Sequence, residues 1–255
     1  MRALSGTLRR QNRGESGGRP PLGAFASDLD RTLLAPGRGL PRSAYEALEA
    51  AKRLGLYVIV VSGREHSVLR KLVAELPAID ALVGENGAVV ESPRGSVPVP
   101  FGRTAAARAR RRLVGADVDG IETGEVVISA GIERRPELEK ALRGVRVDLV
   151  ENVNRVMVLP RGISKRSGLE QALRRLGAAH VPFAAVGDAS NDLPLLRAAR
   201  LSAAVANAEP MVRSSVHYVC RRRYSEGVRE FVAGPVRDLL LGRAKPASAP
   251  TRSRR

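Results

Sequence analysis

The sequence is short of several residue classes, and each shortage limits what the protein can be. Its 255 residues include one cysteine, so no disulfide can form within the chain, which favours a reducing compartment such as the cytoplasm. Aromatic residues make up 3% of the chain, so leucine, valine and alanine must fill the core. No apolar run approaches the roughly 18 residues that a membrane-spanning helix needs. The sequence therefore predicts a cytoplasmic protein without a membrane partner.

Basic residues are in large excess, and their distribution limits what this charge can mean. The formal net charge is +17, and more than half of it lies in residues 1–20 and 243–255. Both segments are rich in Gly, Ser and Pro, so we expect a disordered basic N-terminal segment and a disordered basic tail. The N-terminal segment has no apolar stretch behind its basic residues and does not resemble a secretory signal. No nucleic-acid-binding motif accompanies the charge, so the sequence does not favour a nucleic-acid partner.

Apolar runs and amphipathic segments alternate along the chain. Residues 22–26, 56–61 and 81–83 are typical of buried strands, with helices predicted at 43–54 and 67–76. This β-α-β-α-β order implies right-handed crossovers and a parallel sheet. The sequence thus predicts an α/β fold with a doubly wound parallel sheet.

The predicted core is divided into two parts by a segment of different character. Between residues 87 and 154 the strand-like and helical pieces are shorter and more polar, which suits a small inserted α/β module with one face in water. We expect this segment to form a cap domain. The core would then consist of residues 21–86 and 155–242.

Two carboxylates follow the first predicted strand. Asp28 and Asp30 lie at its carboxyl end, where ligands bind in open parallel sheets. Because side chains alternate along a strand, both point to the same side. Neighbouring carboxylates repel unless a cation or a shared proton holds them, and Mg²⁺ suits an all-oxygen site that also binds phosphate. Taken alone, such a pair would more often be a turn or a solvated strand end.

Other polar groups follow the predicted core strands or open the next helix. They are Thr32, Ser62, Gly63, Lys165, Asp188, Asn191 and Asp192. Each has an ordinary structural explanation: Ser62 and Gly63 are typical of a turn, and Lys165 of a solvated helix start. The acids near residue 190 could cap a helix. Their combined occurrence at strand ends favours one shared active site.

The order and chemistry of these groups resemble the four motifs of the haloacid dehalogenase superfamily of phosphatases. The resemblance rests on DLDRT, VIVVSGR, the lysine of ISKRSGL, and GDASNDLPLL, and it covers residues 22–242. The insert lies between the second and third motifs, as in the subclass of Cof-like phosphatases, sucrose phosphatase and archaeal phosphoglycolate phosphatase. GENGA and AVANA point to the same subclass. The resemblance implies a phosphoric monoester hydrolase with a Rossmann-like core, a cap and a small phosphorylated substrate.

The resemblance also implies roles for the candidate residues. Asp28 would be the nucleophile that forms an aspartyl-phosphate, and Asp30 the general acid and base. The phosphate-binding residues would be Thr32, Ser62, Gly63, Lys165 and Asn191. The ligands of Mg²⁺ would be Asp28, Asp188, Asp192 and the backbone carbonyl of Asp30.

Two residues depart from the family pattern. Arg31 and Ala189 stand where glycine is usual in the first and fourth motifs. A Cβ at either position would cost about 1 kcal/mol if its φ angle is positive. Neither change removes a functional group.

Some alternatives stay open. A phosphomutase of the phosphomannomutase type would share this set of residues, and a nucleic-acid-binding protein with a vestigial site would use the basic ends. Glu85 and Asn86 either meet substrate or only shape the crossover into the cap. Arg64 either contacts a ligand or is solvated. The cap arginines Arg108, Arg110, Arg111 and Arg112 either form a solvated helix face or steer anionic substrates.

Overall fold

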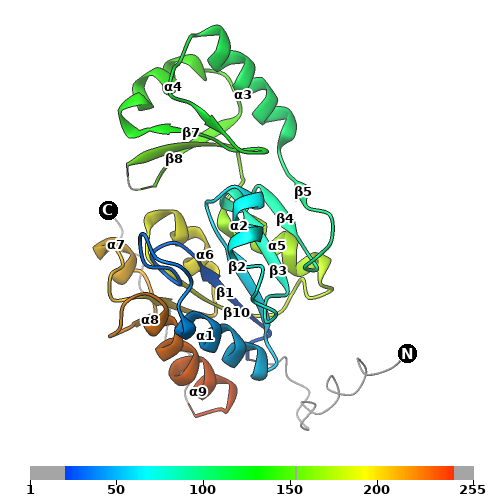
Figure 1. Cartoon of the computed structure of the whole chain (residues 1–255), viewed down its shortest axis with the longest axis vertical. Helices are drawn as coiled ribbons and strands as arrows, with labels where there is room; N and C mark the ends of the chain where they lie inside the picture. Colours follow the sequence, from blue (N-terminus) through cyan, green and yellow to red (C-terminus); the bar gives the residue numbers. More distant parts are fainter. Residues whose placement is uncertain (1–20, 153, 244–255) are drawn as a thin grey trace.

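The structure, a computed structural model, describes residues 21–152 and 154–243. Within these ranges the chain forms a large eight-stranded sheet and a separate four-stranded sheet (Figure 1). The two segments expected to be disordered, 1–20 and 243–255, lie outside the described residues except for Arg243. No described helix is long and apolar enough to cross a membrane.

The large sheet forms the core and is parallel over most of its width. Its strands in spatial order are β12 (Tyr218–Val219), β11 (Leu201–Ala204), β10 (Phe183–Gly187), β1 (Ala24–Asp28), β2 (Tyr57–Val61), β3 (Ala81–Gly84), β4 (Val89–Glu91) and β5 (Val99–Pro100). Pairing is parallel from β12 to β3 and antiparallel from β3 to β5. The central strands are apolar and buried because layers of helices cover them. The predicted α/β class is confirmed.

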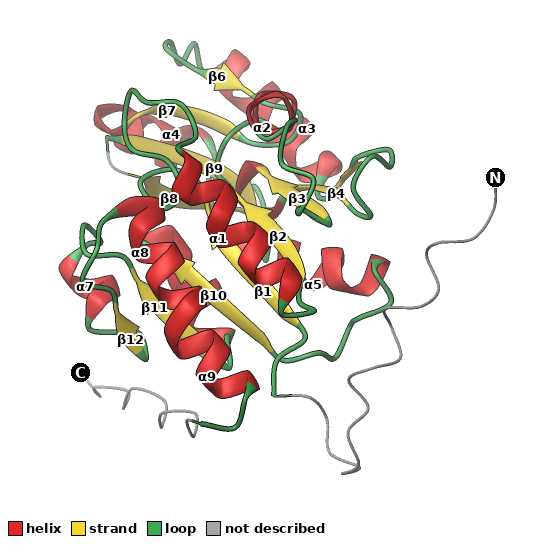
Figure 2. Cartoon of the chain, turned by 60° about the horizontal axis from the view of Figure 1, so that its bottom comes forward, coloured by secondary structure: helices red, strands yellow, loops and turns green. Residues whose placement is uncertain are grey.

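Helices connect the parallel strands or follow the last of them. They are α1 (Arg42–Arg53), α2 (His66–Leu72), α5 (Lys165–Arg175), α6 (Leu193–Ala198), α7 (Pro210–Arg213), α8 (Tyr224–Phe231) and α9 (Arg237–Leu240), with short 3₁₀ turns η1 (Glu85–Gly87) and η3 (Ser190–Asp192). Figure 2 shows α1, α8 and α9 together over one face of the sheet, where Ser43 and Ser225 hydrogen-bond between α1 and α8 at 2.7 Å. The last helix is interrupted: Pro235 lies in a π-helical segment, η4 (Val232–Val236), because proline has no N–H to donate.

The order of the strands reverses at the centre of the sheet. From β1 the chain moves outward through β2 and β3, and it later returns to β10 on the other side of β1 and moves outward to β11 and β12. Right-handed crossovers in opposite directions put their helices on opposite faces, so a crevice opens between the carboxyl ends of β1 and β10. This switch point is where the candidate site lies.

The small sheet belongs to the inserted module, which Figure 1 shows above the core. Its strands in spatial order are β6 (Glu122–Thr123), β7 (Ile128–Gly131), β9 (Arg155–Pro160) and β8 (Val147–Asn152), and it carries α3 (Arg103–Gly115), the turn η2 (Ile132–Arg134) and α4 (Arg135–Ala141). All pairs in this sheet are antiparallel. Leu113, Ile128 and Leu138 are buried in a core of its own. The cap is therefore a second layer with its own hydrophobic cluster.

The sheets do not divide the chain at residues 87 and 154, where the sequence suggested. Strand β4 was expected in the cap but pairs with β3 in the core sheet, and β9 was expected in the core but pairs with β7 and β8 in the cap sheet. Short apolar runs such as these show that a strand is buried without showing which sheet it joins. The chain therefore crosses into the cap near α3 and leaves it after β9.

Candidate active site

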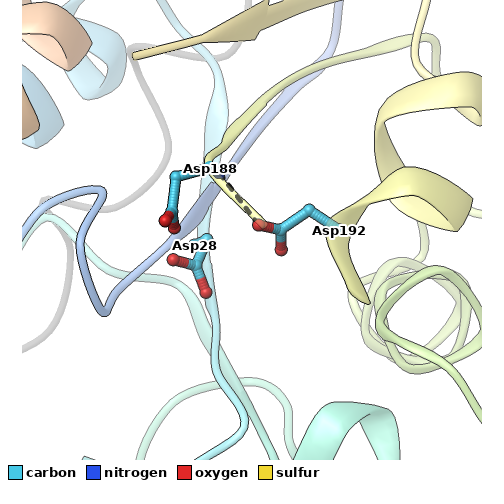
Figure 3. Close-up of side chains that lie close together, drawn as sticks. All are labelled: Asp28, Asp188 and Asp192. Carbon is cyan, nitrogen blue, oxygen red and sulfur yellow. Dashed lines mark hydrogen bonds between the residues drawn. The ribbon is translucent and has the colours of Figure 1, made fainter. Parts of the chain in front are cut away.

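Three buried aspartates meet at the switch point of the core sheet. Carboxylate oxygens of Asp28, Asp188 and Asp192 all lie within 4.8 Å of one another (Figure 3). Asp28 is the last residue of β1, and Asp188 follows β10 directly, so parallel neighbours deliver both acids to the same edge. The sequence predicted this convergence, and the structure brings the three side chains together.

Asp192 is held by the turn that it helps to form. Its Oδ2 accepts hydrogen bonds from the backbone N–H groups of Asp188 and Ala189, at 3.0 and 3.1 Å. Ala189 has an extended backbone with φ −121°, so its Cβ causes no strain where the family usually has glycine. Asp192 therefore stabilises the loop that presents Asp188.

Lys165 joins two of the aspartates. Its Nζ donates to Oδ1 of Asp28 and to Oδ1 of Asp192, both at 2.6 Å. Lys165 is the first residue of α5, which begins with a capping box at Ser164. This helix packs tightly against the turn after β3. Gly87 permits the close approach, since a Cβ at this position would strike the carbonyl oxygen of Ser164. A close approach between α5 and this turn thus brings the lysine to the acids.

Burial sets the ionisation of the cluster. Burial raises the pKa of Asp28 well above its ordinary value, Lys165 opposes the rise, and the negative charges of Asp192 and Asp188 add to it. Burial and then the charge of Asp192 raise the pKa of Asp188 to about 6, against the opposing effects of Lys165, Thr32 and Arg31. Burial lowers the pKa of Lys165, but the charges of Asp192 and Asp28 outweigh this and raise the pKa above its ordinary value. One buried lysine does not fully compensate three acids.

The cluster fits a divalent cation. Oδ2 of Asp28 is buried and has no hydrogen-bond partner, and Oδ2 of Asp188 is buried and accepts no hydrogen bond, although Nε of Arg31 lies 3.2 Å from it. Leaving buried carboxylate oxygens without hydrogen bonds is costly, and a hard cation that prefers oxygen ligands would satisfy both. The oxygens of Asp192 differ, because Oδ1 accepts from Lys165 and Oδ2 from backbone N–H groups. Asp28 and Asp188 are therefore the better ligands, with Asp192 supporting them.

Asp30 lies at the rim of the cluster and is paired with an arginine. Arg64 donates from Nε to both carboxylate oxygens of Asp30, at 3.0 and 2.9 Å, and from Nη2 to Oδ1 at 2.6 Å. These hydrogen bonds raise the pKa of Arg64. Ser62 also points to Asp30, with 3.5 Å between its Oγ and Oδ2. Arg64, left open by the sequence as a ligand contact or a solvated side chain, is instead the partner of Asp30.

The side chains of Thr32 and Arg31 both contact Asp188. Oγ1 of Thr32 donates to Oδ1 of Asp188 at 3.0 Å, so the hydroxyl expected to bind a phosphoryl group is committed to a carboxylate. Arg31 has a left-handed backbone with φ 61°, the conformation for which glycine would be preferred. Its Nε lies 3.2 Å from Oδ2 of Asp188. The departure at Arg31 therefore adds a positive charge beside the cluster.

Two buried residues of η1 link the core with the cap. The side chain of Asn86 accepts a hydrogen bond from Nδ2 of Asn191 at 3.1 Å and donates to the sulfur of Met157 in β9. The carboxylate of Glu85 accepts the backbone N–H groups of residues 125, 126 and 127, each at 2.8 Å. Both residues thus join the crossover to the cap. Asn191 keeps a buried Oδ1 without a hydrogen-bond partner at the pocket.

A cavity of about 300 Å³ opens above the cluster, between core and cap. Its lining residues are Asp28, Asp30, Arg31, Gly63, Asn154, Arg155, Lys165, Asp188, Ala189 and Asn191. Six of the predicted site residues are among them, whereas Thr32, Ser62 and Asp192 are not. Asn154 and Arg155 were missed by the sequence analysis, and the one signal for them is a polar turn between the apolar strands β8 and β9.

Comparisons with known proteins show the family of this chain. The family model of haloacid dehalogenase-like hydrolases matches residues 25–98 and 131–232. The chain belongs to this family, and the predicted resemblance to its phosphatases is confirmed at that level. The stretch between the matched segments, 99–130, carries α3 and β6 of the cap. The chain is thus matched throughout the aspartate cluster and unmatched in part of the cap.

Individual relatives and structures show the same similarity. A phosphoglycolate phosphatase of Methanothrix thermoacetophila is 29% identical over 215 residues, which cover 82% of this chain and 95% of that protein. A solved haloacid dehalogenase-like hydrolase from B. subtilis has a TM-score of 0.70 at 20% identity and covers 84% of this chain and 99% of its own. A subclass IIB sugar phosphatase of the same superfamily has a TM-score of 0.61 at 19% identity, with coverage of 78% and 93%. The two solved structures share the fold of core and cap.

Proposed function

We infer that the protein hydrolyses small phosphomonoesters with the help of Mg²⁺. The observation that carries this conclusion is the position of Asp28, which pairs with Lys165 and lies close to Asp188 at a cavity between core and cap. An anionic nucleophile can approach an anionic phosphate only where positive charge surrounds both. Lys165 supplies part of that charge, and a cation held by Asp28 and Asp188 would supply the rest.

The reaction divides into two displacements. A carboxylate oxygen of Asp28 attacks phosphorus, and the bond from phosphorus to the ester oxygen breaks as an aspartyl-phosphate forms. Asp30 gives the leaving alkoxide its proton and then takes a proton from the water that hydrolyses the intermediate. This water attacks phosphorus, releases inorganic phosphate and restores Asp28. Both acids line the cavity, which supports these roles.

The other predicted residues assist in different ways. The bound metal would neutralise charge on the phosphoryl oxygens. Lys165, held 2.6 Å from the nucleophile, stabilises the same charge from the other side. Asn191 and Gly63 line the cavity, but Nδ2 of Asn191 already donates to Asn86 and its Oδ1 is a buried acceptor. Thr32 and Asp192 position Asp188, and Ser62 lies against Asp30.

The substrate is a small metabolite, either a sugar phosphate or a phosphoglycolate-like ester. A cavity of about 300 Å³ is at the lower end of ligand pockets and admits only a short molecule. A cap over the site excludes polymers and bulk water. Relatives named phosphoglycolate phosphatase, over 82% of this chain, support the shorter ester.

Phosphate release from a panel of esters tests this function. The panel contains phosphoglycolate, glycerol phosphate and hexose phosphates, each with Mg²⁺ and with the metal removed by EDTA. The expected result is metal-dependent release of free phosphate, with the shorter esters preferred. Conversion of a hexose phosphate into its isomer without release would instead identify a mutase, and no reaction of any ester would contradict the proposed function.

A further inference from the structure

Three basic side chains line the cavity, and two of them already serve the aspartates. Lys165 is paired with Asp28 and Asp192, both buried. Arg31 is paired with Asp188. The positive charge of these two residues is therefore committed to the cluster on the cavity floor.

Arg155 is the third, and its acidic partner lies outside the cavity. Its Nη2 is 2.8 Å from an oxygen of Glu122, whose side chain is 72% exposed and does not line the cavity. An ion pair with so exposed a carboxylate stabilises a protein by roughly 1 kcal/mol or less. Among the cavity-lining cations of the described residues, Arg155 is thus the one most available to a ligand.

The cap holds this guanidinium in a defined position. Arg155 begins β9, directly after the turn from β8, and β8 lies beside the core turn η3. Nη2 donates to Oγ of Ser129 on the neighbouring strand β7 at 2.8 Å, and Nη1 donates to Glu122 at 3.1 Å. A planar guanidinium fixed in this way is prepared to bind a second planar anion.

The cavity separates two sites for negative charge. Asp28 and Lys165 lie on its core wall, and Arg155 on its cap wall. A phosphoryl group at Asp28 leaves space for a few further atoms within about 300 Å³. A ligand that reaches both walls therefore has a phosphate at one end and a second anionic group a short distance away.

We propose that Arg155 binds the carboxylate of the substrate, and that phosphate esters of short hydroxy acids are preferred over those of sugars. The proposal rests on the proposed phosphatase function and adds a specificity-determining residue to it. A carboxylate matches the guanidinium fork in shape and charge, whereas a sugar hydroxyl matches neither. The carboxylate displaces or shares the contact with Glu122.

Two esters that differ only in this group provide the test. Phosphoglycolate carries a carboxylate, and 2-phosphoglycolamide carries a neutral amide of the same size. The kcat/KM ratio of the two esters is measured with Mg²⁺ for the wild type, for Arg155→Met and for Glu122→Gln. Arg143→Met is the matched control, since this arginine is an exposed cap residue that does not line the cavity.

The wild type is expected to prefer phosphoglycolate by about tenfold or more, and Arg155→Met to remove this preference mainly through KM. Glu122→Gln, at an exposed site, removes a competing carboxylate and increases the preference. Arg143→Met leaves the preference as in the wild type. Thermal unfolding of each variant establishes that it is folded.

Different results overturn different claims. A wild type that hydrolyses both esters equally well, or an Arg155→Met variant that keeps the wild-type preference, would overturn the role of Arg155 and leave the phosphatase function standing. An equal loss on both esters in Arg155→Met would show a general structural role and overturn it too. Only a wild type inert on every ester would contradict the phosphatase function itself.

Discussion

The guanidinium of Arg64 donates hydrogen bonds from two nitrogen atoms to the carboxylate of Asp30, with N···O distances from 2.6 to 3.0 Å. Both side chains are partly exposed, 37% and 42%, at the rim of the cavity. An exposed pair of this kind contributes little to stability. Its consequence is positional, because it fixes the orientation of the Asp30 carboxylate.

Arg64→Ala is expected to lower kcat by about tenfold on alkyl phosphates, because a misaligned acid protonates the leaving alkoxide poorly. The loss should be much smaller on p-nitrophenyl phosphate, whose leaving group needs no proton. Steady-state kinetics on both esters check this, with Arg53→Ala on the exposed side of α1 as the control. Equal losses on the two esters would show that Arg64 does not act through Asp30.

Arg31→Gly is expected to tighten Mg²⁺ binding by about three- to tenfold. The arginine places a positive charge beside an oxygen that would bind the cation, and the two positive charges repel. The distance of 3.2 Å from its Nε to Oδ2 of Asp188 motivates this. Isothermal titration of the metal into the protein measures the effect. Arg31→Lys keeps the charge and should bind as the wild type does; unchanged affinity in Arg31→Gly would contradict the prediction.

The pKa of Asp188, raised to about 6 from 3.8, predicts an unusual pH dependence of stability without divalent metal. Between these two values the folded state holds its proton while the unfolded state has lost it. The free energy of unfolding should therefore fall as pH rises through this window, by about 2–3 kcal/mol from this group. Above pH 6 the whole loss of stability is present, and bound Mg²⁺ should offset it.

Denaturant unfolding between pH 4 and pH 8 measures this effect, with Asp188→Asn as the matched variant. The variant keeps His66 and His217, whose pKa values are lowered by burial and which make stability rise with pH over part of this range. The difference between the two curves reports Asp188 together with its effect on Asp28, whose pKa the charge of Asp188 raises. Parallel curves would show that this carboxyl group is ionised throughout the range.

Glu85 joins core and cap through three backbone N–H groups, so Glu85→Gln should loosen this junction. An amide in place of the carboxylate turns an N–H toward other N–H groups, and leaving one unsatisfied costs about 1–3 kcal/mol. Hydrogen exchange should show faster exchange at Val126 and Val127, the donors to its Oε2. Glu125→Gln, at an exposed position, is the control and should leave both amides protected.

The sequence could predict the parts of this site that rest on local pattern. Asp28 and Asp188 end or follow apolar strands, and parallel strands bring such ends together whatever the details of packing. The partners of these residues depend on rotamers and long-range contacts instead. Arg64 could equally have been solvated, and His66, for which the sequence suggests no partner, lies 3.2 Å from Glu91 on β4.

Cap residues were the least predictable for the same reason. Arg155 reaches the cavity only because the β8–β9 hairpin docks over the core, and nothing in its own segment encodes that docking. The sequence also did not show that β4 joins the core sheet and β9 the cap sheet, since a short apolar run fits either sheet. The local sequence pattern thus predicts where strands end, whereas the packing of the cap on the core is known only from the structure.

The most direct test of the account is phosphate release by Asp28→Asn at saturating Mg²⁺, compared with the wild type on its best ester. Asparagine keeps the size of the side chain but cannot attack phosphorus, so kcat should fall by about a thousandfold or more. Such a loss in a variant that remains folded would support Asp28 as the nucleophile. A variant that retains phosphate release within about tenfold of the wild type would contradict the central claim.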